Sequence, residues 1–64
     1  MNGTYSIDVV VEAEGFTLRL IRSGGSILMQ RTFLSRNEAE DERDALAEAW
    51  LLPLEIHPTK TIEQ

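Results

Sequence analysis

Hydrophobic and polar residues alternate over residues 4–12, with Val10 as the one apolar residue at a polar position. A period of two is typical of a β-strand with one buried face. The pattern therefore predicts a strand over 4–12, and Gly15, free to adopt positive φ, predicts a short turn after it. One face of the strand carries Tyr5, Ile7, Val9 and Val11, and the other carries Ser6, Asp8, Val10 and Glu12.

The alternation returns twice more, on either side of a pair of glycines. It predicts strands over 16–22 and 27–33, joined by a two-residue hairpin turn at Gly24 and Gly25, because the turns that suit twisted strands require positive φ. That loop sets the cross-strand register and places most of the apolar side chains on one face. The predicted pairs on that face are Leu20 with Met29, Leu18 with Arg31, and Phe16 with Phe33.

Arg31 is the one charged residue on this apolar face, and we expect its long side chain to reach the sheet edge or an acid on a helix. On the opposite face, Ile21 pairs with Leu28, and Val10 lies nearby. These three residues would form an apolar patch with no helix over it. Such a patch predicts a surface for a homodimer or for another partner.

A helical period begins after the third strand. Ser35 and Glu38 form a capping box, which starts a helix, and Pro53 ends it because proline disfavours the helical region at Leu52. The predicted helix spans about 36–52. Its sheet-facing stripe is expected to consist of Ala39, Leu46, Ala49 and Trp50, with Ala45 beside them and Arg43 snorkelling past them.

Residues 54–57 alternate once more and predict either a short C-terminal strand or an extended tail over 54–64. Strands followed by a helix indicate the α+β class. We therefore expect a single domain, 1–64, in which one α-helix packs on one face of a three-stranded antiparallel sheet (ββα-type). A chain of 64 residues can bury only one thin core layer.

The charge is concentrated on the predicted helix. The chain has 11 acidic and six basic residues, for a net charge of −5. Segment 38–48 alone holds six acids and one arginine, which equals the net charge of the whole protein. This distribution disfavours nucleic acid or an anionic membrane as a partner and favours a basic protein surface. The acids are Glu38, Glu40, Asp41, Glu42, Asp44 and Glu48, and we predict that they form the partner-binding site.

The spacing of these charges permits mimicry of nucleic acid. Eleven helical residues rise about 16 Å, so five net charges give roughly one per 3 Å. A single nucleic-acid strand carries one phosphate charge per about 3.4 Å. A solvated helix face that serves no partner is the alternative interpretation of the same residues.

Residues for other chemistry are few. The chain has no cysteine, and His57 is its only histidine, with no nucleophile or carboxylate pair near it in the sequence. The acidic segment fails the calcium-loop pattern, because Ala39 stands at the third position and Glu42 where that loop needs glycine. We therefore expect no enzymatic activity, no cofactor and no metal. Without a signal-like or membrane-spanning segment, a cytoplasmic location is expected.

Two family resemblances extend this interpretation. The small size, the acidic face and the lack of cysteine make the chain similar to the anti-CRISPR proteins of phages and mobile elements. That resemblance implies an inhibitor in a bacterial cytoplasm that presents acids to the DNA-binding part of a CRISPR effector subunit.

The second resemblance concerns the order of the strands, the turn and the helix. It is carried by Gly15, Phe16, Leu18, Gly24, Gly25, Thr32, Phe33, Ser35, Glu38, Ala39, Glu40 and Trp50. This pattern resembles the arm-type DNA-binding domain of tyrosine integrases, although the chain lacks the basic surplus of that family. The resemblance implies DNA contacts through Thr17, Arg19, Gln30 and Thr32 on the sheet face away from the helix, with Arg22 beside them.

Overall fold

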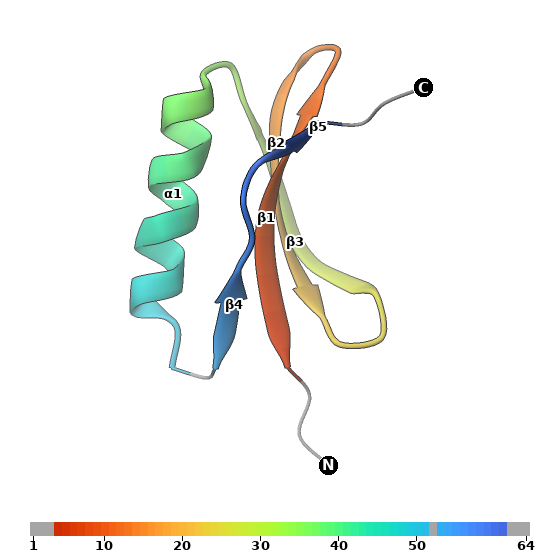
Figure 1. Cartoon of the computed structure of the whole chain (residues 1–64), viewed down its shortest axis with the longest axis vertical. Coiled ribbons are helices and arrows are strands. Elements are labelled where there is room, and N and C mark those ends of the chain that lie inside the picture. The colour runs from red at the N-terminus through yellow and green to blue at the C-terminus, as the bar shows by residue number, and fades with distance from the viewer. Residues whose placement is uncertain (1–3, 52, 62–64) are drawn as a thin grey trace.

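The described part of the chain folds into one helix and a mixed five-stranded sheet, shown as a computed structural model in Figure 1. The structure describes residues 4–51 and 53–61. The expected α+β class is confirmed. The elements in chain order are β1 (Tyr5–Glu12), β2 (Gly15–Arg22), β3 (Ser26–Phe33), α1 (Arg36–Ala49), β4 (Leu54–Ile56) and β5 (Lys60–Thr61).

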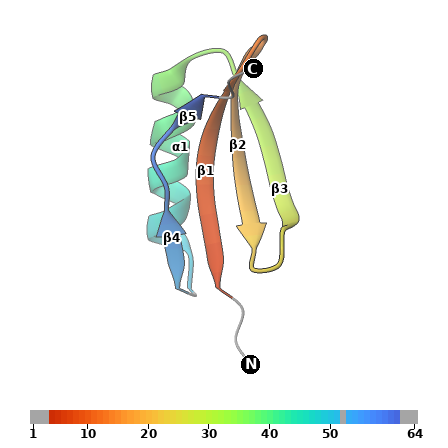
Figure 2. The same ribbon diagram turned by 45° about the vertical axis from the view of Figure 1, so that its right-hand side comes forward.

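The sheet is larger than the predicted three antiparallel strands. Its order is β3-β2-β1-β4, and β5 also pairs with β1 (Figure 2). The first three strands are antiparallel as expected, whereas β4 and β5 both run parallel to β1. Parallel pairing follows from the direction of the chain: β3 runs with β1, α1 returns the chain across the sheet, and β4 again runs with β1. The C-terminal residues thereby make β1 a central strand.

The turn between β1 and β2 consists of Ala13 and Glu14, one residue shorter than predicted. Gly15 is the first residue of β2 and has φ +154°. A Cβ atom at this position would lie 2.5 Å from the Phe33 carbonyl oxygen on β3. Glycine is therefore required here by the close approach of β3 as well as by its backbone angle.

The hairpin between β2 and β3 has a three-residue loop instead of the predicted two-residue loop. Arg22 pairs with Ser26, and Gly24 and Gly25 have φ of +101° and +97°. A bulge at Leu28 offsets the additional loop residue, so that Ile21 pairs with Ile27 instead of Leu28. Beyond the bulge the predicted pairs are correct: Leu20 with Met29, Leu18 with Arg31, and Phe16 with Phe33.

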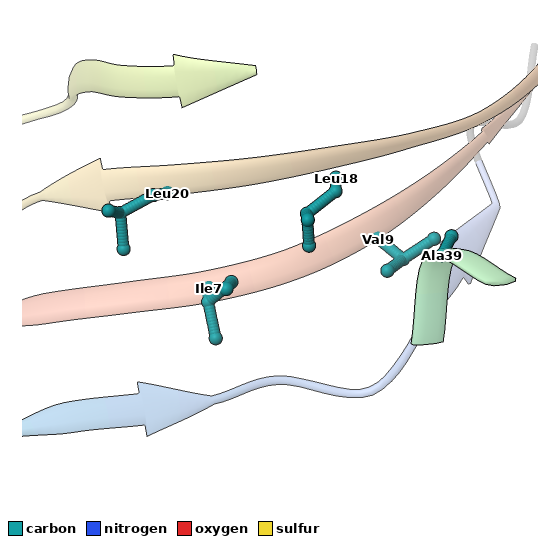
Figure 3. Close-up of a cluster of buried hydrophobic side chains, with 5 residues drawn as sticks. All are labelled: Ile7, Val9, Leu18, Leu20 and Ala39. Carbon is teal, nitrogen blue, oxygen red and sulfur yellow. The ribbon is translucent and has the colours of Figure 1, made fainter. Parts of the chain in front are cut away.

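The core lies between α1 and one face of the sheet. Its fully covered side chains come from β1, β2 and the second turn of α1 (Figure 3). Phe16, Met29, Phe33, Leu46, Trp50 and Leu54 pack around it. Because Ala39 has no side chain beyond Cβ, it allows the helix backbone to approach the sheet closely. The buried cluster consists of Ile7, Val9, Leu18, Leu20 and Ala39.

The start of α1 is as predicted, and its end is earlier. The Ser35 hydroxyl accepts a hydrogen bond from the Glu38 amide at 3.4 Å. The helix ends at Ala49, and Trp50 is extended, with its ring packed edge-on against Tyr5 at 5.7 Å. Pro53 has no N–H to donate to the Ala49 carbonyl, so a further turn would leave that carbonyl unpaired.

The apolar stripe of the helix is narrower than predicted. Ala39, Leu46 and Trp50 face the sheet, but Ala45 and Ala49 are exposed, so their assignment to the core was wrong. Arg43 does lie against the fold and is only 14% exposed. The predicted helical residue Leu52 lies outside the described residues.

Candidate functional site

The six acids of the helix segment point in different directions. Glu40 faces the C-terminal segment, where its carboxylate accepts hydrogen bonds from the Thr59 hydroxyl and, at 2.9 Å, from the Arg36 Nε. The Thr59 hydrogen bond, followed by that of Arg36, lowers the pKa of Glu40 below its ordinary value. Glu40 therefore joins α1 to the residues before β5 and is less free for a partner than its position in the sequence suggests.

Glu42 faces β3 on the other side of the helix. Its carboxylate lies 3.4 Å from Arg31 Nη1, and the Arg31 guanidinium also lies over the Phe33 ring at 5.6 Å. The expectation that Arg31 reaches an acid on the helix is confirmed. Glu42 thereby neutralises the one arginine that interrupts the apolar face of the sheet.

Arg43 is the second link between α1 and the C-terminal segment. Its Nη1 donates to the His57 carbonyl at 3.2 Å, and its Nε donates to the Asp44 carboxylate at 3.0 Å. The His57 amide in turn donates to the Ile7 carbonyl on β1 at 2.9 Å. This segment is therefore held by the sheet on one side and by the helix on the other.

The remaining acids lie on the outer side of α1. Asp41, Asp44 and Glu48 are exposed, and Glu38 is exposed at the start of the helix. Among the described residues, no basic side chain forms an ion pair with Asp41 or Glu48. We call Asp41, Asp44 and Glu48 the outer acidic stripe.

An open groove of about 560 Å³ runs between this stripe and β4. Its lining consists of the stripe, which we call the rim, and of alanine side chains from α1 and apolar side chains from β4, which we call the floor. The β4 part was missed by the sequence interpretation, because pairing of residues 54–56 with β1 cannot be seen in their short alternation. The floor residues are Ala45, Ala47, Leu54 and Ile56.

The outer acidic stripe is sparser than the sequence suggested. Asp41 and Glu48 are seven residues apart, or about 10 Å along the helix, so three carboxylates stand roughly 5 Å apart. The estimate of one net charge per about 3 Å included all six acids of segment 38–48. Glu40 and Glu42, however, point away from the outer acidic stripe. The stripe carries the same sign of charge as a nucleic-acid strand at a lower density.

The sheet face away from α1 holds an ion cluster around the buried Asp8 carboxylate. Two parallel hydrogen bonds, of 2.9 and 2.7 Å, join Arg19 to the Asp8 carboxylate. Lys60 of β5 adds its ammonium group 3.4 Å from the same carboxylate. The Asp8 side chain is only 5% exposed and the Arg19 side chain 29%. This bidentate pair satisfies the two guanidinium nitrogens that would otherwise be offered to a phosphate.

Burial alone would raise the pKa of Asp8, but the hydrogen bonds and charges of Arg19 and then Lys60 outweigh burial and lower it.

Because the folded state binds the Asp8 proton less tightly than the unfolded chain does, the Asp8–Arg19 pair adds stability above the unfolded pKa of about 3.9. We expect that stability to be lost as the pH falls from about 4 through the lowered folded pKa. This loss is measured by urea unfolding of the wild type and of Asp8→Asn between pH 7 and pH 2. If both proteins lose the same free energy of unfolding over this range, Asp8 is not the source of the loss.

Two other residues of the implied DNA-contact face, Thr17 and Thr32, are also engaged. Thr17 is buried, and its hydroxyl donates to the Glu12 carboxylate at 2.8 Å and lies 3.3 Å from the Thr32 hydroxyl. Gln30 is exposed next to Arg19 in the register. A DNA phosphate on this face would meet Glu12 and Asp8 as well as the basic groups, which opposes binding.

The predicted apolar patch on this face differs from expectation. Val10 is only 2% exposed, so it adds almost no area, and Ile21 is partly buried. Ile27 and Leu28 on the edge strand β3 are 49% and 47% exposed. The bulge moves Ile27 opposite Ile21 and thereby shifts the exposed apolar area toward the sheet edge.

His57 has a neighbour that its sequence context did not suggest. The Glu55 carboxylate, two residues earlier, lies 3.3 Å from His57 Nε2. Side chains two residues apart in an extended segment lie on the same face, so the spacing of Glu55 and His57 could have predicted this contact. Within residues 4–51 and 53–61, no group of three or more potential ligands is arranged to hold a metal ion. The described helix is neither long nor apolar enough to cross a membrane.

No protein-family model matches this sequence, and comparison with the curated proteins and with the solved structures found no similar protein.

Proposed function

We propose that this protein binds a basic surface of a partner protein through the outer acidic stripe of α1, and that it inhibits a nucleic-acid-binding protein in the manner of an anti-CRISPR protein. The partner surface in this proposal is one that normally contacts DNA or RNA, for instance on a CRISPR effector subunit. Binding there would exclude the nucleic acid by occupying its site.

The proposal depends on a difference between the acids of α1: some form ion pairs within the chain and others do not. Glu40 and Glu42 each bind an arginine of the same chain, whereas Asp41 and Glu48 are exposed and have no basic partner among the described residues. Asp41 and Asp44, and also Asp44 and Glu48, are like-charge neighbours that disfavour the helix slightly. Arg43 offsets part of this repulsion by donating to the Asp44 carboxylate, and the carboxylates of Asp41 and Glu48 are available to pair with a basic partner.

The DNA-binding alternative has less support. Arg19, the central residue of the implied DNA-contact face, is held by Asp8 through two hydrogen bonds. Releasing it for a phosphate would leave a buried carboxylate with only Lys60 beside it. Breaking such a pair is costly, and the net charge of −5 also opposes DNA binding.

The proposal is tested by competition against DNA. Purified CRISPR effector–guide complexes of several types are incubated with the protein, and binding to labelled target DNA is measured at low and at high salt. We expect inhibition of at least one effector, strongest at low salt, because screening weakens attraction between exposed charges. Direct binding of the protein to the labelled DNA in the same assay would instead support the integrase-arm alternative.

The site itself is tested by a matched pair of charge reversals. Glu48→Lys lies in the outer acidic stripe, whereas Glu14→Lys lies in the exposed turn between β1 and β2, and both change the net charge by two units. We expect Glu48→Lys to weaken inhibition by roughly three- to tenfold at low salt through a slower association rate, and Glu14→Lys to change it far less. Equal effects of the two variants would show that only the net charge matters, and the proposed site would be wrong.

A further inference from the structure

We propose that the free edge of β4, together with the groove between β4 and α1, binds an extended basic segment of the partner protein, which adds to the sheet as one more strand. The basic character of that segment rests on the proposed function. The manner of binding goes beyond it, because it involves backbone atoms and apolar side chains that a purely electrostatic contact does not use.

The backbone of β4 is available on its outer side. The His57 amide donates to Ile7 on β1, so the His57 N–H and the backbone groups of Glu55 point toward β1. Backbone groups alternate in direction along a strand, and those of Leu54 and Ile56 therefore point away from β1. The sheet order places no strand beyond β4 within the described residues. An incoming strand can pair with these outward groups.

The side chains beside this edge determine what kind of segment fits. Leu54 and Ile56 pair with Tyr5 and Ile7, whose side chains are on the helix-facing side of the sheet. Ile56 is 51% exposed because α1 does not cover β4 completely. Every second side chain of an added strand would point into this groove and contact its apolar floor. Longer side chains at the rim would meet the carboxylates of the outer acidic stripe, so lysine or arginine is favoured there.

Charge also disfavours a second copy of this chain as the occupant. Pairing β4 with β4 of another copy would bring two outer acidic stripes to the same interface. Like charges at short range oppose association. The complementary occupant is therefore a segment that alternates apolar and basic residues.

The edge of β4 is short, and this limits how the segment can bind. Pro53 and Pro58 flank the strand, and Pro58 lacks the N–H that would continue the outward ladder. Only Leu54 and Ile56 then offer outward pairing groups, which protects the edge from extended aggregation. With so few backbone hydrogen bonds, the rim charges and the groove must supply much of the affinity.

The test uses two synthetic seven-residue peptides of equal composition. In one peptide lysine and valine alternate, and in the other the valines are grouped together. Binding to the isotopically labelled full chain is followed by NMR titration. We expect the alternating peptide to bind at least about fivefold more tightly, because only the alternating pattern fits the groove and the rim together. Its binding should also shift the amide resonances of Leu54 and Ile56 and slow hydrogen exchange at the Ile56 amide. If neither peptide binds, or if both bind equally well, the inference is wrong.

Two changes to the chain separate this inference from the proposed function. N-methylation of the Ile56 amide in a chemically synthesised chain removes an outward donor and leaves every charge in place. We expect it to weaken binding of the alternating peptide about tenfold or more, because the methyl group also occupies the position of the added strand. If the methylated chain binds normally while Glu48→Lys weakens binding, strand addition is wrong and the acidic site remains. If Glu48→Lys has no effect on either peptide, the electrostatic premise fails, and the inference fails with it.

A substitution in the groove covers the case in which the methylated chain does not fold. Ala45→Arg would place a large basic side chain in the groove, and Asn37→Arg makes the same change of charge at an exposed position in the first turn of α1. We expect Ala45→Arg to weaken the alternating peptide about tenfold and Asn37→Arg to weaken it less than about threefold. Equal weakening by both would mean that the peptide does not enter the groove, and the inference would be wrong.

Discussion

Replacing Leu18 with alanine should lower the free energy of unfolding by about 3 kcal/mol, within the range for a fully buried leucine. Leu18 is 0% exposed, and it lies in the middle of β2 among the buried side chains shown in Figure 3. A domain of this size has a total stability of only about 3–10 kcal/mol. The Leu18→Ala protein is therefore expected to unfold at a much lower urea concentration, which fluorescence of the single tryptophan, Trp50, can report.

Leu28→Ala is the matched control, because it removes the same atoms from a side chain that is 47% exposed at the bulge of β3. We expect it to cost less than about 1 kcal/mol. If the two variants lose the same stability, the core does not lie under α1 as described. If Leu28→Ala is destabilised only at high protein concentration, the exposed β3 edge takes part in self-association.

Replacing Arg19 with methionine should be the other strongly destabilising change. It leaves the Asp8 carboxylate, only 5% exposed, with Lys60 at 3.4 Å as its remaining cationic neighbour. Removing one partner of a buried pair typically costs about 3–5 kcal/mol. Since Lys60 compensates in part, we expect about 3 kcal/mol at pH 7, measured by urea unfolding.

A double variant tests whether this cost comes from the uncompensated charge. Asp8→Leu combined with Arg19→Met removes both members of the pair and fills their place with apolar atoms. Such replacements are often neutral or stabilising, so we expect the double variant to recover most of the lost stability. If it is as unstable as Arg19→Met alone, the loss comes from packing of the arginine stem instead of from the unpaired carboxylate.

The Arg19 result also bears on function. An arginine used to bind DNA is expected to affect DNA affinity more than stability, because a phosphate contact is made only in the complex. The opposite result, a large loss of stability, would assign Arg19 to the fold. The same distinction applies to Glu40, whose contacts with Thr59 and Arg36 give it a structural role within the acidic segment.

Much of the fold could be predicted from local patterns. Alternation predicted the first three strands, because a sheet with one buried face imposes a period of two on its side chains. The capping box predicted the start of α1, because Ser35 satisfies the Glu38 amide within the same few residues. The two glycines predicted the hairpin, but the predicted register beyond Leu28 is correct only because the bulge offsets the additional loop residue. These features depend on residues close together in the sequence.

Other features were decided only by contacts between distant residues. The pairing of β4 and β5 with β1 depends on where α1 returns the chain, and no short segment encodes that position. Next to the loop, β2 and β3 pair in one register, and beside the core they pair in a register that differs by one residue. The bulge at Leu28 accommodates this difference. Burial of Asp8 depends on Arg19 and Lys60, which come from two different strands.

The acidic segment shows the same division. The sequence by itself determined that six acids lie on one helix and carry the net charge of the protein. Only the tertiary structure decided which acids are available, because Arg31 of β3 reaches Glu42, and Thr59 before β5 reaches Glu40. It also placed β4 beside Asp41, Asp44 and Glu48 and so created the groove. Composition and spacing set the charge of a helix, but its neighbours in space determine which of those charges remain free.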